Sequence, residues 1–499
     1  MSLTVQLAAP NGRNIDLPTG LFINNEWVHA TQKKTITSIN PADESEIASV
    51  QAATAEDVDI AVDAARAALL RPAWAGMHPS ARGELIRKLS DLVQENIEDL
   101  ATLETWDSGK PYSVSLNDDL PEVVSCLRYY AGFADKLHGQ VIDSGTTKFA
   151  YTVREPVGVC GQIIPWNYPL MMAAWKLGPA LACGNTVVLK PSELTPLSIL
   201  YFADLIEKAG FPPAVVNVLN GLGQETGTAI ASHSGIDTIA FTGSTATGQK
   251  IMAMAASNIK NITLETGGKS PLLVFDDADL DQAVKWAHVG IMSNQGQICS
   301  GTSRIIVQKG VYERFIAAFK RHTEKTSTVG DPFCEEIFQG PQISKSQYDR
   351  VLSYISSGVK QGARLVLGGA PLNRETPGFF ILPTIFADVT EEMTISREEI
   401  FGPVVVISAF ETEEEAVRKA NNSPYGLGCA IFTQNLERSH RLARKMESGT
   451  LWINNSNDSD SRTPFGGVKQ SGIGRELGEA GLEAYSSIKS IHVNISAKL

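Results

Sequence analysis

From about residue 157 onward, short apolar strands alternate with helices, and this alternation restricts the chain to a small set of folds. The segment VGVCGQII at 157–164 is typical of a buried strand, and TVVLK at 186–190 of a second one. Thr195 and Pro196 then begin a helix that Gly210 ends. Strands that alternate with helices predict a parallel sheet of the doubly wound type.

A second set of the same kind follows from Leu272 to about Asn455. Its expected helices lie near 279–292, 311–326 and 412–421, and its expected strands include VVVISAF, CAIFT and TLWIN. Before both sets, Thr54 and Asp57 predict the start of a helix that Pro72 ends. A longer helical region is expected from about Ser80 to Thr105. The terminal SIKSIHVNI alternates without a partner nearby in sequence, and we expect it to complete a sheet elsewhere, on this or another subunit.

Size, charge and cysteine content narrow the classes of function. A chain of 499 residues is expected to form two or more domains. The formal net charge of −12 argues against nucleic acid or an anionic membrane as the main partner. The first twenty residues lack the pattern of a secretory or mitochondrial leader, so a cytoplasmic protein is expected. Six scattered cysteines without a CxxC pair predict neither a metal site nor a disulfide framework.

Two glycine-rich turns follow strands and open helices. One runs from Asn220 to Gly227, and the other is FTGSTATG at 241–248. Glycines let the backbone approach a ligand closely, and the free amides at a helix start suit a pyrophosphate. The alternative interpretation is an ordinary tight turn of an α/β fold.

The segment KPSE at 190–193 comes directly after a strand. In an open parallel sheet, ligands bind at the carboxyl ends of the strands. Lys190 and Glu193 could therefore contact an adenosine ribose, and the charge of Glu193 would repel a 2′-phosphate. The alternative is a solvated ion pair on a loop.

Three further segments contain candidate catalytic groups. Cys299, in NQGQICS, follows a glycine and an expected helix, so its thiol is a candidate nucleophile. Glu265, in LETGGKSP, ends a strand where burial would raise its pKa and suit it as a general base. Asn167, between two prolines in PWNYP, is a rigid amide that could stabilise an oxyanion. Taken singly, each could equally be a structural residue.

Together, these segments closely resemble the aldehyde dehydrogenase superfamily, in particular its hydrolytic NAD-dependent branch. The resemblance runs from about Leu21 to His492. The motifs that carry it are PWNYP, KPSE, FTGSTATG, LETGGKSP, NQGQICSG, EEIFGPV and PFGGVKQSG, which occur in the family's order. Several matching motifs in one chain are far more specific than any one of them.

The resemblance implies roles residue by residue. Cys299 matches the nucleophile, Glu265 the base that activates water, Asn167 the oxyanion donor, and Glu476 a second acid that relays protons. The residues expected to contact NAD are Ile163, Ile164, Pro165, Trp166, Lys190, Ser192, Glu193, Gly223, Thr242, Gly243, Ser244, Gly248, Gly267, Glu399 and Phe401. The residues expected to line the substrate tunnel are Tyr168, Met172, Trp175, Met292, Ile298, Ser300, Asp458 and Phe465.

The expected architecture is an α/β chain with two doubly wound parallel-sheet domains and a small β oligomerisation element. We expect a Rossmann-like NAD-binding domain at 1–138 and 157–267, and a catalytic domain at 268–475. The oligomerisation element is expected at 139–156 and 476–499. Relatives form dimers or tetramers, so a homo-oligomer, most simply a homotetramer, is implied.

Two departures from the family pattern concern the site. Thr266 stands where the family commonly has leucine, and we expect an effect on packing only. The stretch at 455–461 is polar, whereas relatives that prefer apolar aldehydes have aromatic or aliphatic residues there. Ser293 likewise stands where relatives often have phenylalanine. These residues favour small or polar aldehydes.

Three alternative functions make different predictions. A CoA-acylating relative would lack the glutamate base, so Glu265 favours hydrolysis. A non-catalytic protein built on this fold would have lost Cys299 or Glu265, and both are present. An alcohol-type oxidoreductase would need a zinc site or a Tyr/Lys proton relay, and the sequence contains no convincing example of either.

Overall fold

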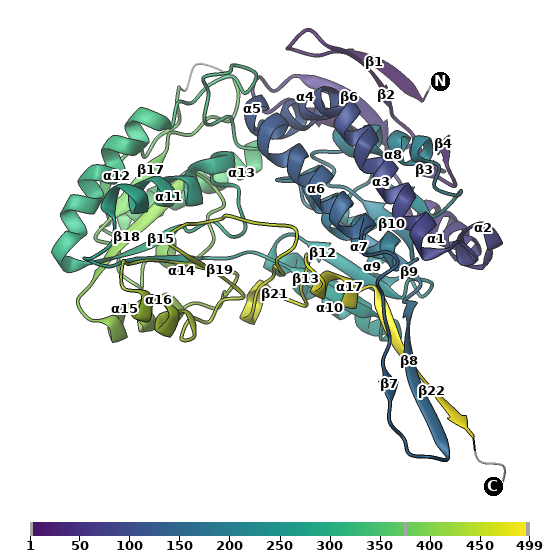
Figure 1. The fold of residues 1–499 in the computed structure, drawn as a ribbon. Helices are drawn as coiled ribbons and strands as arrows, with labels where there is room; N and C mark the ends of the chain where they lie inside the picture. Colours follow the sequence, from purple (N-terminus) through teal and green to yellow (C-terminus); the bar gives the residue numbers. More distant parts are fainter. Residues whose placement is uncertain (1–2, 374–376, 496–499) are drawn as a thin grey trace.

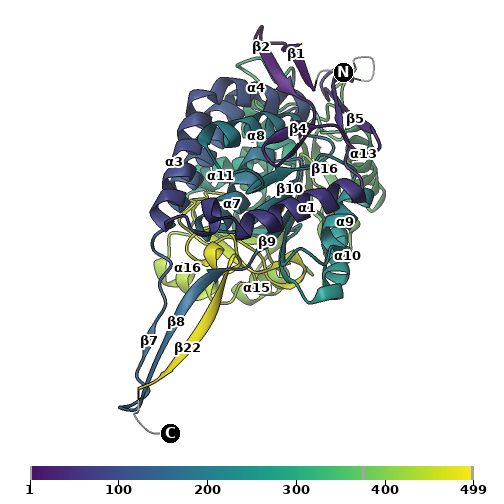
Figure 2. The same cartoon turned by 90° about the vertical axis from the view of Figure 1, so that its right-hand side faces the viewer.

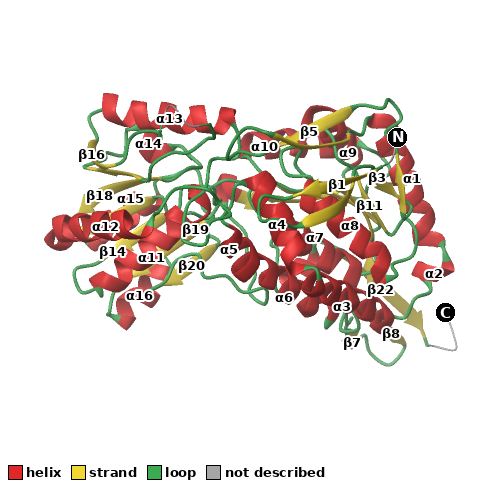
Figure 3. Ribbon diagram, turned by 90° about the horizontal axis from the view of Figure 1, so that it is seen from above, coloured by secondary structure: helices red, strands yellow, loops and turns green. Residues whose placement is uncertain are grey.

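The structure is a computed structural model that describes residues 3–373 and 377–495. Figure 1 and Figure 3 show two lobes side by side, each built around a mainly parallel sheet, and a narrow β arm that projects from one of them. The expected α/β fold with two parallel sheets is confirmed.

The first lobe contains an eight-stranded sheet in the order β21-β13-β12-β9-β10-β11-β3-β4. Its strands are β3 (Leu21–Ile23), β4 (Glu26–Val28), β9 (Val159–Ile163), β10 (Thr186–Lys190), β11 (Val216–Val218), β12 (Thr238–Thr242), β13 (Asn261–Glu265) and β21 (Gly472–Ile473). The five central strands run parallel, with β9 between β10 and β12. The chain reverses its direction of growth at β9, so the crevice for a ligand lies at the carboxyl ends of these strands.

Helices cover both faces of this sheet. On one face they are α3 (Pro79–Glu95), α4 (Ile97–Ser108), α6 (Leu120–Ala131), α7 (Pro169–Ala182) and α8 (Leu197–Ala209). The other face packs against α1 (Ala55–Leu70), α9 (Thr228–Ser232) and α10 (Thr245–Ala255). Shorter helices and turns are α2 (Pro72–Ala75), α5 (Tyr112–Val114), η1 (Ser115–Asp119), η2 (Gly223–Gly227) and η3 (Ala256–Asn258).

The first helices lie where the sequence predicted them. Thr54 and Asp57 form the expected capping box of α1, because the Asp57 carboxylate accepts from the Thr54 amide at 2.8 Å. The helical region expected over 80–105 is confirmed and consists of two helices, α3 and α4. They divide at Asn96, whose side-chain amide donates to the Leu92 carbonyl at 2.8 Å and so ends α3.

The second lobe contains a seven-stranded sheet in the order β16-β17-β18-β15-β14-β19-β20, parallel except for β16. Its strands are β14 (Pro271–Val274), β15 (Arg304–Gln308), β16 (Arg364–Leu367), β17 (Thr384–Ala387), β18 (Val404–Phe410), β19 (Gly428–Phe432) and β20 (Thr450–Ile453). Its helices and turns are α11 (Leu280–Met292), η4 (Ser293–Gly296), η5 (Lys309–Val311), α12 (Tyr312–Thr326), α13 (Lys345–Lys360), α14 (Thr394–Arg397), α15 (Glu413–Asn421), α16 (Leu436–Ala443) and η6 (Lys469–Ser471).

The arm is a three-stranded antiparallel sheet in the order β22-β8-β7. Its strands are β7 (Val141–Ile142), β8 (Lys148–Pro156) and β22 (Ser486–Asn494), which follows the short α17 (Ala480–Glu483). The terminal strand thus finds a partner far away in its own chain, and Figure 2 shows the arm extending clear of both lobes. Residues 496–499, the end of the expected oligomerisation element, lie outside the described residues, as do residues 1–2 of the expected first domain.

Two N-terminal hairpins have no counterpart among the elements expected from sequence. They pair β1 (Thr4–Ala8) with β2 (Asn14–Pro18), and β5 (Thr35–Ile39) with β6 (Glu46–Gln51). Over residues 3–373 and 377–495, no helix combines the length and apolar character needed to cross a membrane.

Candidate active site

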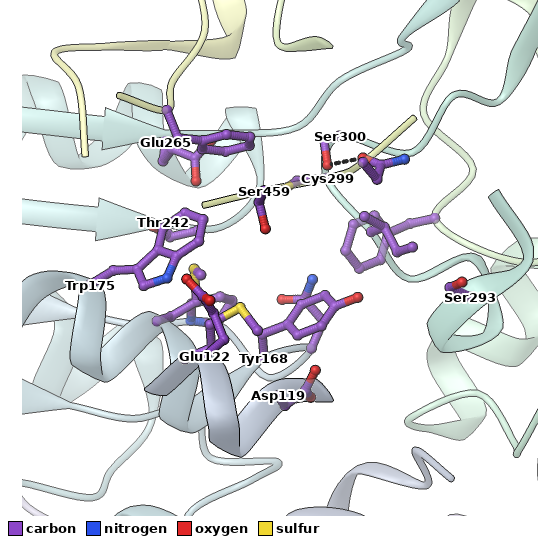
Figure 4. A pocket seen from close by; sticks show the side chains of 18 of the residues that line it. Asp119, Glu122, Tyr168, Trp175, Thr242, Glu265, Ser293, Cys299, Ser300 and Ser459 are labelled. Atoms are coloured by element: carbon purple, nitrogen blue, oxygen red, sulfur yellow. Dashed lines mark hydrogen bonds between the residues drawn. The ribbon is translucent and has the colours of Figure 1, made fainter. Parts of the chain in front are cut away.

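A cavity of about 750 Å³ lies where the two lobes meet. Its wall includes Thr242 and Glu265 at the ends of β12 and β13, Cys299 from the turn after α11, and Trp452 from β20. Figure 4 shows Glu265 and Cys299 on one side of this cavity, with Trp175 and Tyr168 facing them. Candidate groups from distant parts of the sequence therefore share one cavity.

Cys299 is presented by a tight backbone turn. Asn294 and Gln295 have positive φ angles of 46° and 56°, and Gly296 has a φ of 71°. A Cβ at Gly296 would lie 2.0 Å from the Gly402 carbonyl oxygen, so only glycine fits there. Burial, followed by the negative charges of Glu265 and Glu399, raises the pKa of the Cys299 thiol above its ordinary value.

Asn167 lies beside this turn, in the loop after β9. Its side-chain amide donates to the Gln297 carbonyl at 2.9 Å, and the Asn294 amide donates to the Asn167 carbonyl at 3.0 Å. These contacts fix the Asn167 side chain close to the turn that precedes Cys299. Its second amide N–H is available to a ligand oxygen.

Glu265 is 2% exposed, and neither carboxylate oxygen has a hydrogen-bond partner within the described residues. Burial and the charge of Glu476 raise the pKa of Glu265, while Lys176 opposes that shift. A buried, unpaired carboxylate on a cavity wall is suited to accept a proton from a ligand or water. The neighbouring Thr266 donates its hydroxyl to the Gln470 carbonyl at 2.6 Å, which anchors the end of β13.

Glu476 is linked to the cavity through Lys176. The Lys176 ammonium donates to the Glu476 carboxylate and to the Thr242 hydroxyl, each at 2.6 Å. Both charged side chains are buried, whereas Glu476 itself does not line the cavity. Sequence reasoning did not single out Lys176, because its partners are remote in sequence.

Many of the residues expected to contact NAD surround the same cavity. Its lining includes Pro165, Trp166, Thr242, Gly243, Ser244, Gly267, Glu399 and Phe401. A Cβ at Gly267 would lie 2.1 Å from a Glu399 carboxylate oxygen, so glycine is needed for this approach. The Glu399 carboxylate accepts from the Gly268 amide at 3.0 Å, and burial raises its pKa to about 7.

A second cavity of about 710 Å³ lies against the first sheet near β10 and η2. Ile163, Glu193 and Gly223 line it. The Lys190 ammonium contacts the Glu193 carboxylate at 3.3 Å, which orients the carboxylate at the cavity rim. Residues expected to contact the cofactor thus line two separate cavities.

Some expected residues lie behind the cavity walls. Ile164, Lys190, Ser192 and Gly248 do not line either cavity. Met292 is fully buried in the core of the second lobe, and the neighbouring Val289 and Ser293 line the cavity instead. The other expected substrate residues, Tyr168, Met172, Trp175, Ile298, Ser300, Asp458 and Phe465, all line the larger cavity.

The structure adds wall residues that the sequence did not reveal. Asp118, Glu122, Trp286 and Trp452 line the larger cavity from four separate elements. None lies in a motif, so only the fold brings them to the site.

A doubly wound sheet whose crevice holds a thiol, an amide and a buried carboxylate is typical of a dinucleotide-dependent enzyme. Comparison with known proteins then identifies the family. The model of the aldehyde dehydrogenase family matches residues 27–491, and the chain belongs to this family.

Relatives match over nearly the full length. An aldehyde dehydrogenase of Emericella nidulans is 52% identical, covering 97% of this chain and 96% of its own. The mitochondrial aldehyde dehydrogenase of Mesocricetus auratus is 50% identical, covering 99% of each chain. An NAD+ complex of aldehyde dehydrogenase from Bacillus cereus superposes with a TM-score of 0.94 at 49% identity, covering 96% of this chain and 97% of its own.

Proposed function

We propose that the protein oxidises an aldehyde to a carboxylic acid, with NAD as cofactor, through a thioester on Cys299. The observation that carries the proposal is that Cys299, Asn167 and Glu265 line the same cavity at the crevice of the first sheet. The family and the NAD+ complex of the Bacillus cereus relative support the reaction and the cofactor.

The residues fit a two-stage reaction. The Cys299 sulfur bonds to the aldehyde carbon, and negative charge develops on the former carbonyl oxygen. The Asn167 amide and the Cys299 backbone N–H are the donors for that oxygen. Oxidation of this adduct leaves a thioester. Glu265 then takes a proton from water, which attacks the thioester and releases the acid.

NAD fits the residues present. Glu193, which Lys190 orients from behind the cavity wall, would hold the adenosine ribose. The start of α10 at Ser244 would hold the pyrophosphate, and Glu399 the nicotinamide ribose. The negative charge of Glu193 disfavours a 2′-phosphate and therefore favours NAD over NADP. When bound, NAD supplies the acceptor for the hydride.

The test is replacement of the nucleophile. Cys299→Ala should abolish NADH formation from every aldehyde, because the bond to the substrate carbon cannot form. NAD should still bind, as measured by calorimetry, because no cofactor contact depends on the thiol. Cys334→Ala is the matched control, since Cys334 is an exposed free cysteine that does not line the cavity. Retention of most activity in Cys299→Ala would reject the mechanism.

Assembly and compartment are part of the proposal. Among the strands of the described residues, β22 is at the edge of its sheet, which supports assembly through this strand into a homotetramer or dimer. All six cysteines are free thiols, which supports the reducing cytoplasm. Relatives include a protein named mitochondrial, so cell fractionation and mass measurement in solution are the appropriate tests.

A further inference from the structure

One part of the larger cavity carries a concentration of negative charge. Asp118 and Asp119 come from the turn before α6, Glu122 from the first turn of α6, and Asp458 from the loop after β20. Asp118 and Asp458 are exposed, so they lie at the mouth, whereas Glu122 is half-buried. Figure 4 shows the Glu122 carboxylate beside the Trp175 indole, across the cavity from Cys299.

Lys110 balances this charge only in part, since its positive charge also opposes the rise that burial causes in the pKa of Asp118. Asp119 pairs with Lys110, whose ammonium also lies 3.7 Å from the centre of the Tyr168 ring. Among the cavity-lining residues, all of which the structure describes, the one basic side chain is Arg350. Its guanidinium donates to the Glu399 carbonyl at 3.0 Å, on the cofactor side. Asp118, Glu122 and Asp458 therefore face the cavity without a cationic partner on its wall.

The Glu122 carboxylate is held in place. The Ser461 hydroxyl donates to it at 2.6 Å, across 339 residues of sequence. Burial raises the pKa of Glu122 more than the Ser461 hydrogen bond lowers it, so the ionised carboxylate lacks full electrostatic compensation. A bound cation would supply that compensation.

Aromatic rings complete the wall. Trp175, Trp286 and Trp452 all line the cavity. The Trp452 indole N–H donates to the Asp458 carbonyl at 2.8 Å, and Trp175 packs edge-on against Phe465 with centroids 5.3 Å apart, so both rings are fixed. The face of an indole attracts cations, and this attraction strengthens away from bulk water.

The wall also contains a polar atom that the protein leaves unsatisfied. Trp175 is 4% exposed, and its indole N–H has no hydrogen-bond partner. Buried donors are almost always paired in folded proteins, so an unpaired one on a cavity wall indicates a place for a ligand or its water. This observation is independent of the carboxylates.

We propose that the preferred substrate is an aldehyde carrying a positively charged nitrogen, which the carboxylates and indole faces hold while the carbonyl meets Cys299. This inference rests on the proposed function and specifies its substrate class. An uncharged polar aldehyde would form no ion pair with these carboxylates. A long alkyl aldehyde would remove water from them and provide no compensating interaction.

Matched pairs of aldehydes isolate the charge. Betaine aldehyde and 3,3-dimethylbutanal differ by nitrogen against carbon, as do protonated 3-aminopropanal and butanal. For the wild-type protein with NAD, we expect kcat/KM for each charged aldehyde to exceed that of its neutral partner by about tenfold. Equal or reversed preference in both pairs would overturn the inference.

Three variants assign the preference to the wall. Glu122→Gln and Asp118→Asn should each lower the charged-to-neutral ratio of kcat/KM by about threefold to tenfold while turnover of the neutral aldehyde persists. Asp460→Asn is the control, because Asp460 lies in the same loop as Asp458, pairs with Arg462 and does not line the cavity. Its ratio should not change.

The possible outcomes separate the two proposals. If the wild type oxidises none of the four aldehydes, the proposed function fails. If kcat/KM is equal for the neutral and charged members, or if Glu122→Gln lowers kcat/KM equally for both members of a pair, only the proposal of a cationic substrate is rejected.

Discussion

Breaking the buried ion pair between Lys176 and Glu476 tests how these two charges set the pKa of Glu265, the proposed base. The two groups are 0% and 4% exposed, with nitrogen and oxygen 2.6 Å apart. Removing one partner of such a pair costs about 3–5 kcal/mol, because the other charge stays buried and unpaired. At about 1.4 kcal/mol per factor of ten, Glu476→Gln should lower the folding equilibrium constant by roughly two to four powers of ten. Urea denaturation of wild type and variant measures this loss.

The same variant makes a prediction about pH. The Glu476 charge raises the pKa of Glu265, whereas Lys176 lowers it. Glu476→Gln removes the first effect and keeps the second, so the pKa of Glu265 should fall. Glu265 accepts a proton only when ionised. In single-turnover experiments, the rate of thioester hydrolysis should therefore begin to fall at a lower pH in the variant than in the wild type. An unchanged pH for this fall, or a higher one, would refute this account of the base.

A double variant separates charge from packing. Lys176→Met combined with Glu476→Gln removes both charges and keeps side chains of similar volume. Its loss of stability should be smaller than the sum of the two single losses, because neither charge remains unpaired. Strict additivity would show that the two side chains act independently.

Three further predictions concern the site. Glu265→Gln should accumulate a thioester on Cys299, visible by mass spectrometry, and lower turnover by about 10²–10⁴; undiminished turnover would contradict the base assignment. Asn167→Ala should lower kcat by about 10²–10³ in steady-state assays with little change in NAD affinity, and a change confined to KM would argue against an oxyanion role. Glu193→Gln should raise kcat/KM for NADP relative to NAD, and an unchanged ratio would remove the structural basis for the cofactor preference.

The sequence predicted those elements whose signals are local. The parallel strands are continuous apolar runs, and Thr54 with Asp57 is a complete helix start within four residues. The short N-terminal hairpins were not recognised, because strands of five or six residues with few buried positions give only a weak signal in the sequence. The partner of the terminal strand was out of reach, since β22 pairs with β8 more than 300 residues earlier.

The candidate site divides in the same way. Cys299, Glu265 and Asn167 lie in motifs at or shortly after the ends of secondary-structure elements. Their place at the edge of a sheet could therefore be predicted from the sequence. Lys176 and Glu122 carry no such signal. Their importance comes from burial and from partners 300 and 339 residues away, which only the folded chain defines.

The positions of the carboxylates in the cavity affect both the ionisation of Cys299 and the binding of a cationic substrate. A nucleophilic thiol needs a site that tolerates negative charge, yet a cationic substrate is best held by carboxylates. The carboxylates that raise the pKa of Cys299 are Glu265 and Glu399, which lie deep in the cavity. Asp118 is exposed, so salt screens its charge over a Debye length of about 8 Å at physiological ionic strength. An acid at the mouth can therefore attract a cation arriving from solvent while adding little to the energy of forming the thiolate.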